Sequence, residues 1–169
     1  PLVSGTTGYC DEEAARVNAL GSYAPVAVSA NFSIGVAVLK HLAAEAAALL
    51  PDFDIEIIET HHRMKKDAPS GTAKLLLSAV NPDGTHPTVF GREGFAPRTA
   101  DEIGVHAVRG GTVAGVHTVS FFGDEEELSL THRAESRRIF AIGALKTAEK
   151  LKDAPVGLHT LDELLFARR

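Results

Sequence analysis

The first 30 residues of the chain are patterned as a strand, a turn, a helix and a second strand, and this pattern constrains the fold more than any other feature. An apolar run over residues 1–3 stops at Gly5-Thr6-Thr7-Gly8, residues 11–20 have helical composition, and residues 25–28 form a second apolar run. Two short strands joined by a helix predict a βαβ unit of a parallel sheet. Because a parallel sheet needs further strands and covering helices, we expect the chain to be a fragment of a larger protein.

The middle of the chain is predicted to alternate between helix and strand. Apolar residues recur at helical spacing over residues 36–50, and Asn31 or Ser33 can cap this helix. Residues 54–59 alternate partly between polar and apolar, which suits a half-buried strand. A helix over residues 73–80 is expected to start behind a Ser or Thr cap.

The second half of the chain is predicted to be mainly strands followed by helices. Residues 81–101 are rich in Gly, Pro and charge, and they indicate a long surface connection. Three strands separated by Gly-containing turns predict an antiparallel meander, over residues 103–108, 113–122 and 127–132. Two capped helices are expected over residues 137–151 and 160–166. The whole pattern predicts an α/β chain with a mixed sheet.

Composition excludes several classes of protein. The formal net charge of −5 over 169 residues gives no basic surface for a nucleic acid or an anionic membrane. The single cysteine, Cys10, rules out an internal disulfide or a cysteine-rich zinc site, and it favours a reducing compartment such as the cytoplasm. Apolar stretches such as residues 43–50 are much shorter than the roughly 20 residues that span a bilayer.

The segment from Glu59 to Thr72 is the main candidate for a functional site. Two imidazoles, a guanidinium and two ammonium groups lie within residues 59–66, as expected where an anion is bound and a proton is transferred. A solvated basic turn explains this cluster equally well when it is taken alone. Pro69-Ser70-Gly71-Thr72 then places hydroxyls at a helix start, where free amides and the helix dipole attract a carboxylate. Together the two features predict a site for a small carboxylate-bearing substrate.

Other chemistries match the sequence less well. Neighbouring residues of an extended chain point to opposite sides, so His61 and His62 are poorly placed to chelate one ion, and we predict no metal site. A serine hydrolase is not expected, because no Gly-x-Ser-x-Gly elbow is present. The remaining histidines share no spacing and are interpreted as surface or core residues: His41, His86, His106, His117, His132 and His159.

The motifs resemble those of the dihydrodipicolinate reductase family, which acts in the diaminopimelate route to lysine. Residues 59–73 match the family's motif almost residue for residue. Four shorter motifs follow the family's order, at residues 5–8, 30–33, 91–94 and 109–111. The resemblance implies a Rossmann-type dinucleotide-binding domain and an open mixed sheet that binds substrate and builds a homotetramer. No Gly-x-Gly-x-x-Gly follows a strand here, so most of the nucleotide-binding fold is expected outside this chain.

The resemblance also implies a division of the chain and a reaction. Residues 1–30 would be the last βαβ unit of the dinucleotide-binding domain, residues 31–135 the substrate and oligomerisation domain, and residues 136–169 helices that return to the first domain. The implied reaction reduces the conjugated imine of a small dicarboxylate with NADPH or NADH. Two alternatives stay open, namely another two-domain NAD(P)-dependent dehydrogenase of an amino acid or semialdehyde, and a non-catalytic binding or oligomerisation fragment.

The family motif assigns a role to each matching residue. His61 and Lys65 would be the acid–base pair, with Lys65 donating a proton after hydride addition. The substrate-binding residues implied by the motif are His62, Ser70, Gly71 and Thr72. The residues that would lie beside the nicotinamide cofactor are Gly5, Thr6, Thr7, Ser29, Ala30, Asn31 and Phe32.

Overall fold

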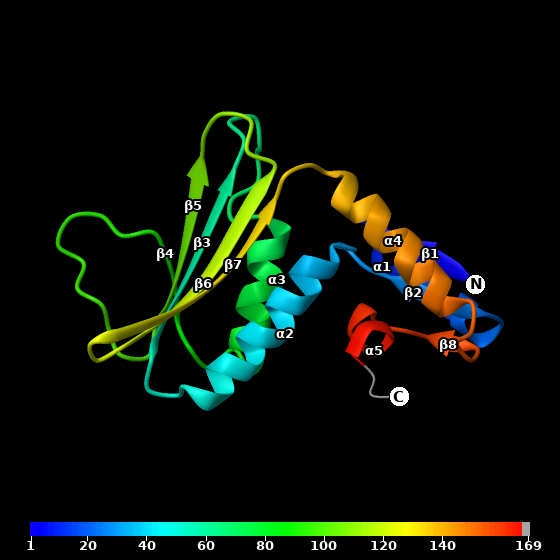
Figure 1. The fold of residues 1–169 in the computed structure, drawn as a ribbon, viewed down its shortest axis with the longest axis horizontal. Coiled ribbons are helices and arrows are strands. Elements are labelled where there is room, and N and C mark those ends of the chain that lie inside the picture. Colours follow the sequence, from blue (N-terminus) through cyan, green and yellow to red (C-terminus); the bar gives the residue numbers. More distant parts are fainter. Residues whose placement is uncertain (167–169) are drawn as a thin grey trace. The chain divides into compact units, whose positions relative to one another are not determined.

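The computed structural model describes residues 1–166 and shows two compact units (Figure 1). The first unit consists of Pro1–Ala37 and the chain from Arg137 onward, and the second consists of Val38–Ser136. Both units combine helices with a sheet, which confirms the expected α/β class. Among residues 1–166, no helix has the length and apolar character needed to cross a membrane.

The first unit is a small parallel sheet with helices. Its elements in chain order are β1 (Leu2–Ser4), α1 (Asp11–Ala19), η1 (Leu20–Ser22), β2 (Pro25–Val28), α4 (Arg138–Leu151), β8 (Gly157–Leu158) and α5 (Leu161–Phe166). The strands lie in the order β1-β2-β8, and both pairings are parallel. The predicted βαβ unit is therefore confirmed. Strand β8 was not predicted, because two residues are too few to show an alternating pattern.

The second unit is built on a five-stranded mixed sheet. Its elements are the greater part of α2 (Ile34–Leu49), then β3 (Asp54–His61), α3 (Gly71–Val80), β4 (Thr88–Phe90), β5 (Ile103–Arg109), β6 (Gly115–Gly123) and β7 (Glu126–Ala134). The strands lie in the order β4-β5-β3-β6-β7. The central strand β3 pairs in parallel with β5 and antiparallel with β6. The predicted mixed sheet is confirmed.

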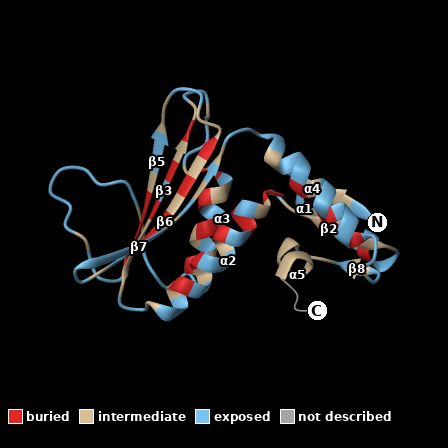
Figure 2. Cartoon of the chain, viewed as in Figure 1, coloured by how far each residue is buried: buried red, intermediate tan, exposed pale blue. Residues whose placement is uncertain are grey.

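Within this unit, helices cover one face of the sheet, and no helix covers the other, called the uncovered face, where Arg98 of the long connection forms an ion pair with Glu56. Figure 1 shows α2 and α3 on the same side of strands β3, β5, β6 and β7. Buried residues are concentrated on these helices and on the strands of the sheet (Figure 2), and Leu39, Leu76, Ile57 and Phe121 belong to one apolar core cluster. Burial of this apolar surface is the main contribution to the stability of the unit. The opposite face carries the alternate residues of each strand.

Two strand predictions need correction. The antiparallel meander over residues 103–132 is wrong in its first half, because β5 does not pair with β6. Strand β3 lies between them and pairs with both, so residues 109–112 are not a hairpin turn. Local turn chemistry cannot show that a distant strand takes the place between two successive ones. The surface connection over residues 81–101 also contains the short strand β4, which pairs with β5.

Helix caps place several helix starts close to the predicted positions. The Ser33 hydroxyl accepts a hydrogen bond from the Val36 amide at the start of α2. The Ser70 hydroxyl accepts from the Ala73 amide at 3.1 Å and starts α3 at Gly71, two residues before the predicted start. The final helix α5 has a Thr160 cap, as predicted. Helix α4 begins at Arg138, one residue after the predicted start, and its N-cap residue Arg137 makes no side-chain cap bond, so the predicted Ser136 cap is wrong.

Gly143 provides a test of the packing of α4. It is buried in α4, and a Cβ atom at this position would overlap the carbonyl oxygen of Phe32. At an open helix position Gly→Ala stabilises by about 1 kcal/mol, because alanine has the higher helix propensity. We predict the opposite sign for Gly143→Ala, a loss of about 2 kcal/mol from overpacking. Urea unfolding measures this value, and a gain in stability would contradict the packing described.

Candidate active site

A buried carboxylate, that of Glu59, is the centre of the candidate site. Alternation along β3 places Glu59 on the helix-covered face together with Ile57 and His61, and its side chain has no exposed surface. Arg109, at the end of the neighbouring strand β5, donates two hydrogen bonds to it, to Oε2 at 2.8 Å and to Oε1 at 2.7 Å. The Ser70 amide donates a third to Oε1 at 2.9 Å. These partners provide the compensation that a buried charge requires.

The surroundings of Glu59 favour its ionised form. Burial alone would raise the pKa of this carboxyl, but hydrogen bonds from Arg109, His61 and the Ser70 amide outweigh burial and hold the pKa below its usual value. The same bond also favours the charged form of its partner, since it raises the pKa of Arg109. Glu59 is therefore a carboxylate at neutral pH and accepts hydrogen bonds without donating any.

His61 is oriented by this carboxylate. Its Nδ1 lies 2.6 Å from Glu59 Oε2, and because the carboxylate only accepts, Nδ1 carries the proton. The opposite nitrogen, Nε2, faces Gly115, where an added Cβ would come within 3.1 Å of it. A carboxylate partner fixes the tautomer and the orientation of an imidazole ring. The pair can therefore take part in proton transfer through Nε2 of His61.

His117 lies beside His61 and contacts the start of α3. It is only 4% exposed, and its ring meets that of His61 edge to face with 5.0 Å between the centroids. Its Nε2 is 3.0 Å from the Ser70 hydroxyl. Burial, followed by the nearby charge of His61, lowers the pKa of His117 to about 4, so this imidazole is neutral at pH 7.

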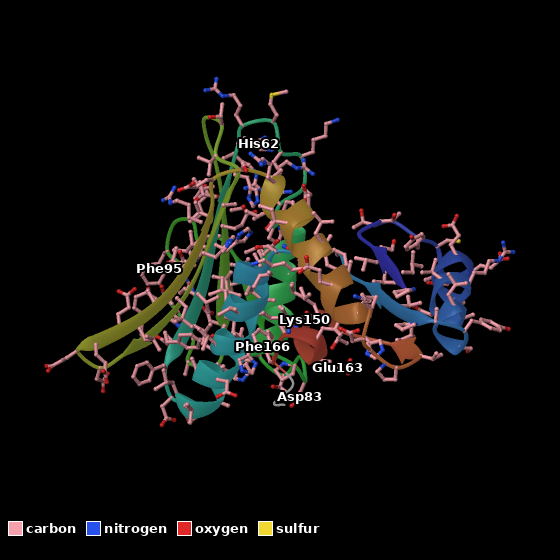
Figure 3. The ribbon with its side chains drawn as sticks, turned by 45° about the vertical axis from the view of Figure 1, so that its right-hand side comes forward. His62, Asp83, Phe95, Lys150, Glu163 and Phe166 are labelled. Carbon is pink, nitrogen blue, oxygen red and sulfur yellow. The ribbon has the colours of Figure 1, made fainter. Side chains whose placement is uncertain are left out.

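The loop after β3 carries the remaining polar groups of the predicted site. Figure 3 labels His62 in this loop, at the end of β3. The backbone of residues 110–111 holds the loop, since the Gly110 amide donates to the His61 carbonyl and the Gly111 carbonyl accepts from the Arg63 amide. Lys65 Nζ forms an ion pair with Asp67 at 2.7 Å, and this bond lowers the pKa of Asp67. An ammonium group therefore lies in the same loop as the His62 imidazole, which directly follows His61 at the end of β3.

The start of α3 is the predicted anion-binding element. Gly71 is its first residue and is exposed, with no protein atom within 4 Å of the place where a Cβ would lie. The first amides of a helix have no partner within the helix and carry the positive end of its dipole. Ser70 itself is buried, with its amide on Glu59 and its hydroxyl on the Ala73 amide and His117. A carboxylate can therefore approach the helix at Gly71.

The predicted cofactor residues lie together in the first unit. Gly5 follows β1 and Ser29 follows β2, so both lie at the carboxyl edge of the parallel sheet, where open α/β sheets bind ligands. The Ser29 amide donates to the Ser4 carbonyl, which ties the two strand ends together. Phe32 is buried, and its ring is 3.6 Å from a Cβ built on Gly5. Gly5, Thr6 and Thr7 are exposed at this edge.

The structure groups the predicted site residues by unit and adds residues that the sequence did not single out. His61, His62, Lys65 and the start of α3 lie around the end of β3, as expected for one site. Arg109 and His117 come from β5 and β6 and were not assigned a role. Only the register of β3 with both strands shows that they face Glu59 and His61. The one sequence signal was the Arg109-Gly110-Gly111 motif.

No metal centre is found in the part of the chain that the structure describes. Among residues 1–166, no three His, Cys, Asp or Glu side chains are grouped so that they could hold a metal ion. The groups described for the candidate site are a carboxylate–imidazole pair with its guanidinium partner, an ammonium group and a helix start.

These features define an α/β protein with a candidate acid–base site next to a candidate carboxylate site. The family model described as "Dihydrodipicolinate reductase, C-terminus" matches residues 35–165. The chain belongs to the dihydrodipicolinate reductase family.

Individual relatives agree with this assignment. The chain is 46% identical over 165 residues to 4-hydroxy-tetrahydrodipicolinate reductase of Methanocorpusculum labreanum, which covers 97% of this chain and 65% of the relative. It is 48% identical over 167 residues to the enzyme of the same name from Aquifex aeolicus, with 97% of this chain and 63% of the relative covered. The chain thus spans a little under two thirds of the length of these relatives.

A solved structure shows the same fold. The structure described as dipicolinate-bound dihydrodipicolinate reductase from Paenisporosarcina sp. TG-14 has a TM-score of 0.76 and 28% sequence identity, and the match covers 97% of this chain and 64% of that chain.

Arg109 allows a test of the buried charge. Removal of one partner from a buried ion pair leaves the other charge without compensation, so we predict that Arg109→Met costs about 3 kcal/mol at pH 7. In the wild type, the pKa of Glu59 is held below its ordinary value, so its stabilising effect is present above the ordinary glutamate pKa and is lost as the pH falls from there through the folded-state pKa. In the variant, burial raises that pKa, so protonation of Glu59 relieves the cost and the difference from wild type shrinks by pH 5.

Urea unfolding of the wild type and of Arg109→Met at pH 7 and at pH 5 measures the difference in unfolding free energy at each pH. The exposed Arg137, which precedes α4 and lies outside the sheet, is the matched control, and Arg137→Met is expected to change stability by less than about 0.5 kcal/mol. A constant loss at both pH values would contradict the account of Glu59.

Proposed function

We propose that the protein containing this chain reduces 4-hydroxy-tetrahydrodipicolinate, or the dihydrodipicolinate derived from it, to tetrahydrodipicolinate. This step belongs to the diaminopimelate route to lysine, and we assign it to the cytoplasm. The observation that carries the proposal is the Glu59–His61 pair, joined through the Ser70 amide to the start of α3. It combines a proton-transfer group and a carboxylate-binding group in one hydrogen-bonded unit. A dicarboxylate substrate that gains a proton requires both groups. Membership of the reductase family supports the same reaction.

The substrate's carboxylates are assigned to two positively polarised groups. One carboxylate binds at Gly71 and Thr72, at the amide end of α3, with Ser70 beside it. The loop that carries His62 and Lys65 supplies positive charge for the second carboxylate of the substrate. The dipicolinate bound in the Paenisporosarcina protein is a planar dicarboxylate of this kind.

Lys65 is proposed as the proton donor and His61 as its acid–base partner. Lys65 forms an ion pair with Asp67 in the loop after β3, so its ammonium protons lie near the site. After hydride addition to the conjugated imine, the product needs one proton on the substrate. The Glu59-supported imidazole of His61 aids that transfer and the return of a proton from solvent.

A nicotinamide cofactor, NADPH or NADH, is proposed to supply the hydride. Its nicotinamide end is assigned to Gly5, Thr6, Thr7 and residues 29–32, since these lie at the carboxyl edge of the parallel strands β1 and β2. The buried ring of Phe32 packs beside Gly5 and gives this edge a fixed apolar base. The division of the chain at residues 30 and 135 is proposed as the border between cofactor and substrate domains.

The uncovered face of the five-stranded sheet is proposed to build a homotetramer. Thr118 and Thr131 are hydrogen bonded across β6 and β7 on this face, and Ile58 and Phe122 are exposed there at 39% and 38%. A mixed polar and apolar sheet face of this kind suits contact with another subunit.

The role of Lys65 can be tested by kinetics of the complete enzyme. We predict that Lys65→Ala lowers kcat about 100-fold or more and raises KM less than tenfold. The reason is that a proton donor acts in the transition state and contributes less to substrate binding. Lys65→Arg keeps the charge but hardly releases a proton, so it is expected to restore KM and leave kcat low. Lys74→Ala, at an exposed position on α3, is the control for loss of charge. An unchanged kcat in Lys65→Ala would remove this residue from the mechanism.

The tetramer can be tested by one substitution on the uncovered face. Thr118→Arg places a charge at the centre of the proposed interface, where an unpaired buried charge is unfavourable. We expect the molar mass from light scattering to fall from that of a tetramer to that of a smaller species. Leu145→Arg, at an exposed position of α4, should leave the mass unchanged. A tetramer in Thr118→Arg would place the interface elsewhere.

A further inference from the structure

His117 is a buried polar residue to which the proposed reaction gives no role. It lies on β6, and the charged or titratable groups that act on it come from each neighbouring element: Glu59 and His61 from β3, Lys65 from the loop, and His132 from β7. Burial of an imidazole among these groups is unfavourable unless its hydrogen bonds are arranged to compensate.

His117 and three other residues form a closed ring of four contacts. Glu59 Oε2 bonds His61 at 2.6 Å, and the rings of His61 and His117 meet edge to face. His117 Nε2 then bonds the Ser70 hydroxyl at 3.0 Å, and the Ser70 amide returns to Glu59 Oε1 at 2.9 Å. His117 therefore joins the proton-transfer imidazole to the start of α3, the two parts of the site that must act on one substrate.

The position of the proton on His117 follows from its partners. The ring is neutral at pH 7 and carries a single N–H. Its Nδ1 is buried and has no hydrogen-bond partner, so a proton there would be a buried unsatisfied donor. The proton is therefore on Nε2, which donates to the Ser70 hydroxyl. The Ser70 oxygen then accepts from both His117 and the Ala73 amide, which leaves its own proton available for another acceptor.

We propose that His117 is a positioning residue: by donating from Nε2 to Ser70 it fixes the start of α3 relative to His61 and leaves the Ser70 hydroxyl proton for a substrate carboxylate. This role rests on the proposed reduction of a dicarboxylate and names the residue that arranges its binding site. His117 does not transfer a proton itself.

Two variants separate the hydrogen bond from the packing of the ring. His117→Phe keeps a ring beside His61 but loses the bond to Ser70, whereas His117→Gln keeps a donor for Ser70 without a ring. In the complete protein with saturating nicotinamide cofactor, we expect His117→Phe to raise the Kd of pyridine-2,6-dicarboxylate about tenfold, the effect of one lost hydrogen bond. We expect KM to rise in parallel, kcat to fall less than threefold, and His117→Gln to bind within about threefold of wild type.

Val119→Ala is the control for loss of stability. Val119 is fully buried two residues further along the same face of β6, and the variant loses core packing without touching the ring of four contacts. Its Kd is expected to match that of wild type. Weakened binding in Val119→Ala equal to that in His117→Phe would overturn the proposal, as would unchanged binding in His117→Phe.

Nitrogen-15 NMR of the histidine rings tests the geometry without substrate. The expected result at pH 7 is a protonated Nε2 and an unprotonated Nδ1 on His117, and the reverse tautomer would overturn the positioning role. If the wild-type protein neither binds pyridine-2,6-dicarboxylate nor reduces the substrate, the proposed function fails. The tautomer still decides whether His117 positions Ser70, so the two failures are distinguishable.

Discussion

The buried ion pair between Glu59 and Arg109 is the interaction on which the rest of the site depends. Glu59 lies on the central strand of the sheet with no exposed surface, and Arg109 reaches it from the parallel neighbour β5. A carboxylate in this place requires compensation, and the guanidinium supplies two of its hydrogen bonds. With its charge held in this way, Glu59 can orient the imidazole of His61 and accept the Ser70 amide at the start of α3.

This arrangement explains why the site needs the mixed sheet. The parallel pairing of β3 with β5 brings Arg109 beside His61, and the antiparallel pairing with β6 brings His117 level with Glu59. A simple hairpin could supply only one of these neighbours. The apolar core, which includes Ile57 and Phe121, holds the strands in register. The site is therefore built on regular elements and not on loops alone. The loop after β3 adds the more exposed groups that meet the substrate.

Much of this could be predicted from the sequence, and the part that could not has a physical reason. Helical periodicity, the Ser70 cap and the alternation in β3 are local signals, so the helices, the central strand and the grouping of His61 with the start of α3 could be predicted. The place of β3 between β5 and β6 depends on contacts between distant segments. The roles of Arg109 and His117 follow from the register of β3 with these two strands. That register cannot be read from the spacing of residues along the chain.

The most direct test of the central claim is to follow the histidine ring signals by NMR while pyridine-2,6-dicarboxylate is added to the cofactor-bound protein. If a dicarboxylate binds between the loop after β3 and the start of α3, the signals of His61 and His62 shift with a saturable dependence on ligand. The signal of His106, whose ring bonds Glu56 on the opposite face of the sheet, stays in place. Equal shifts at all three rings, or none at His61 and His62, would contradict the account.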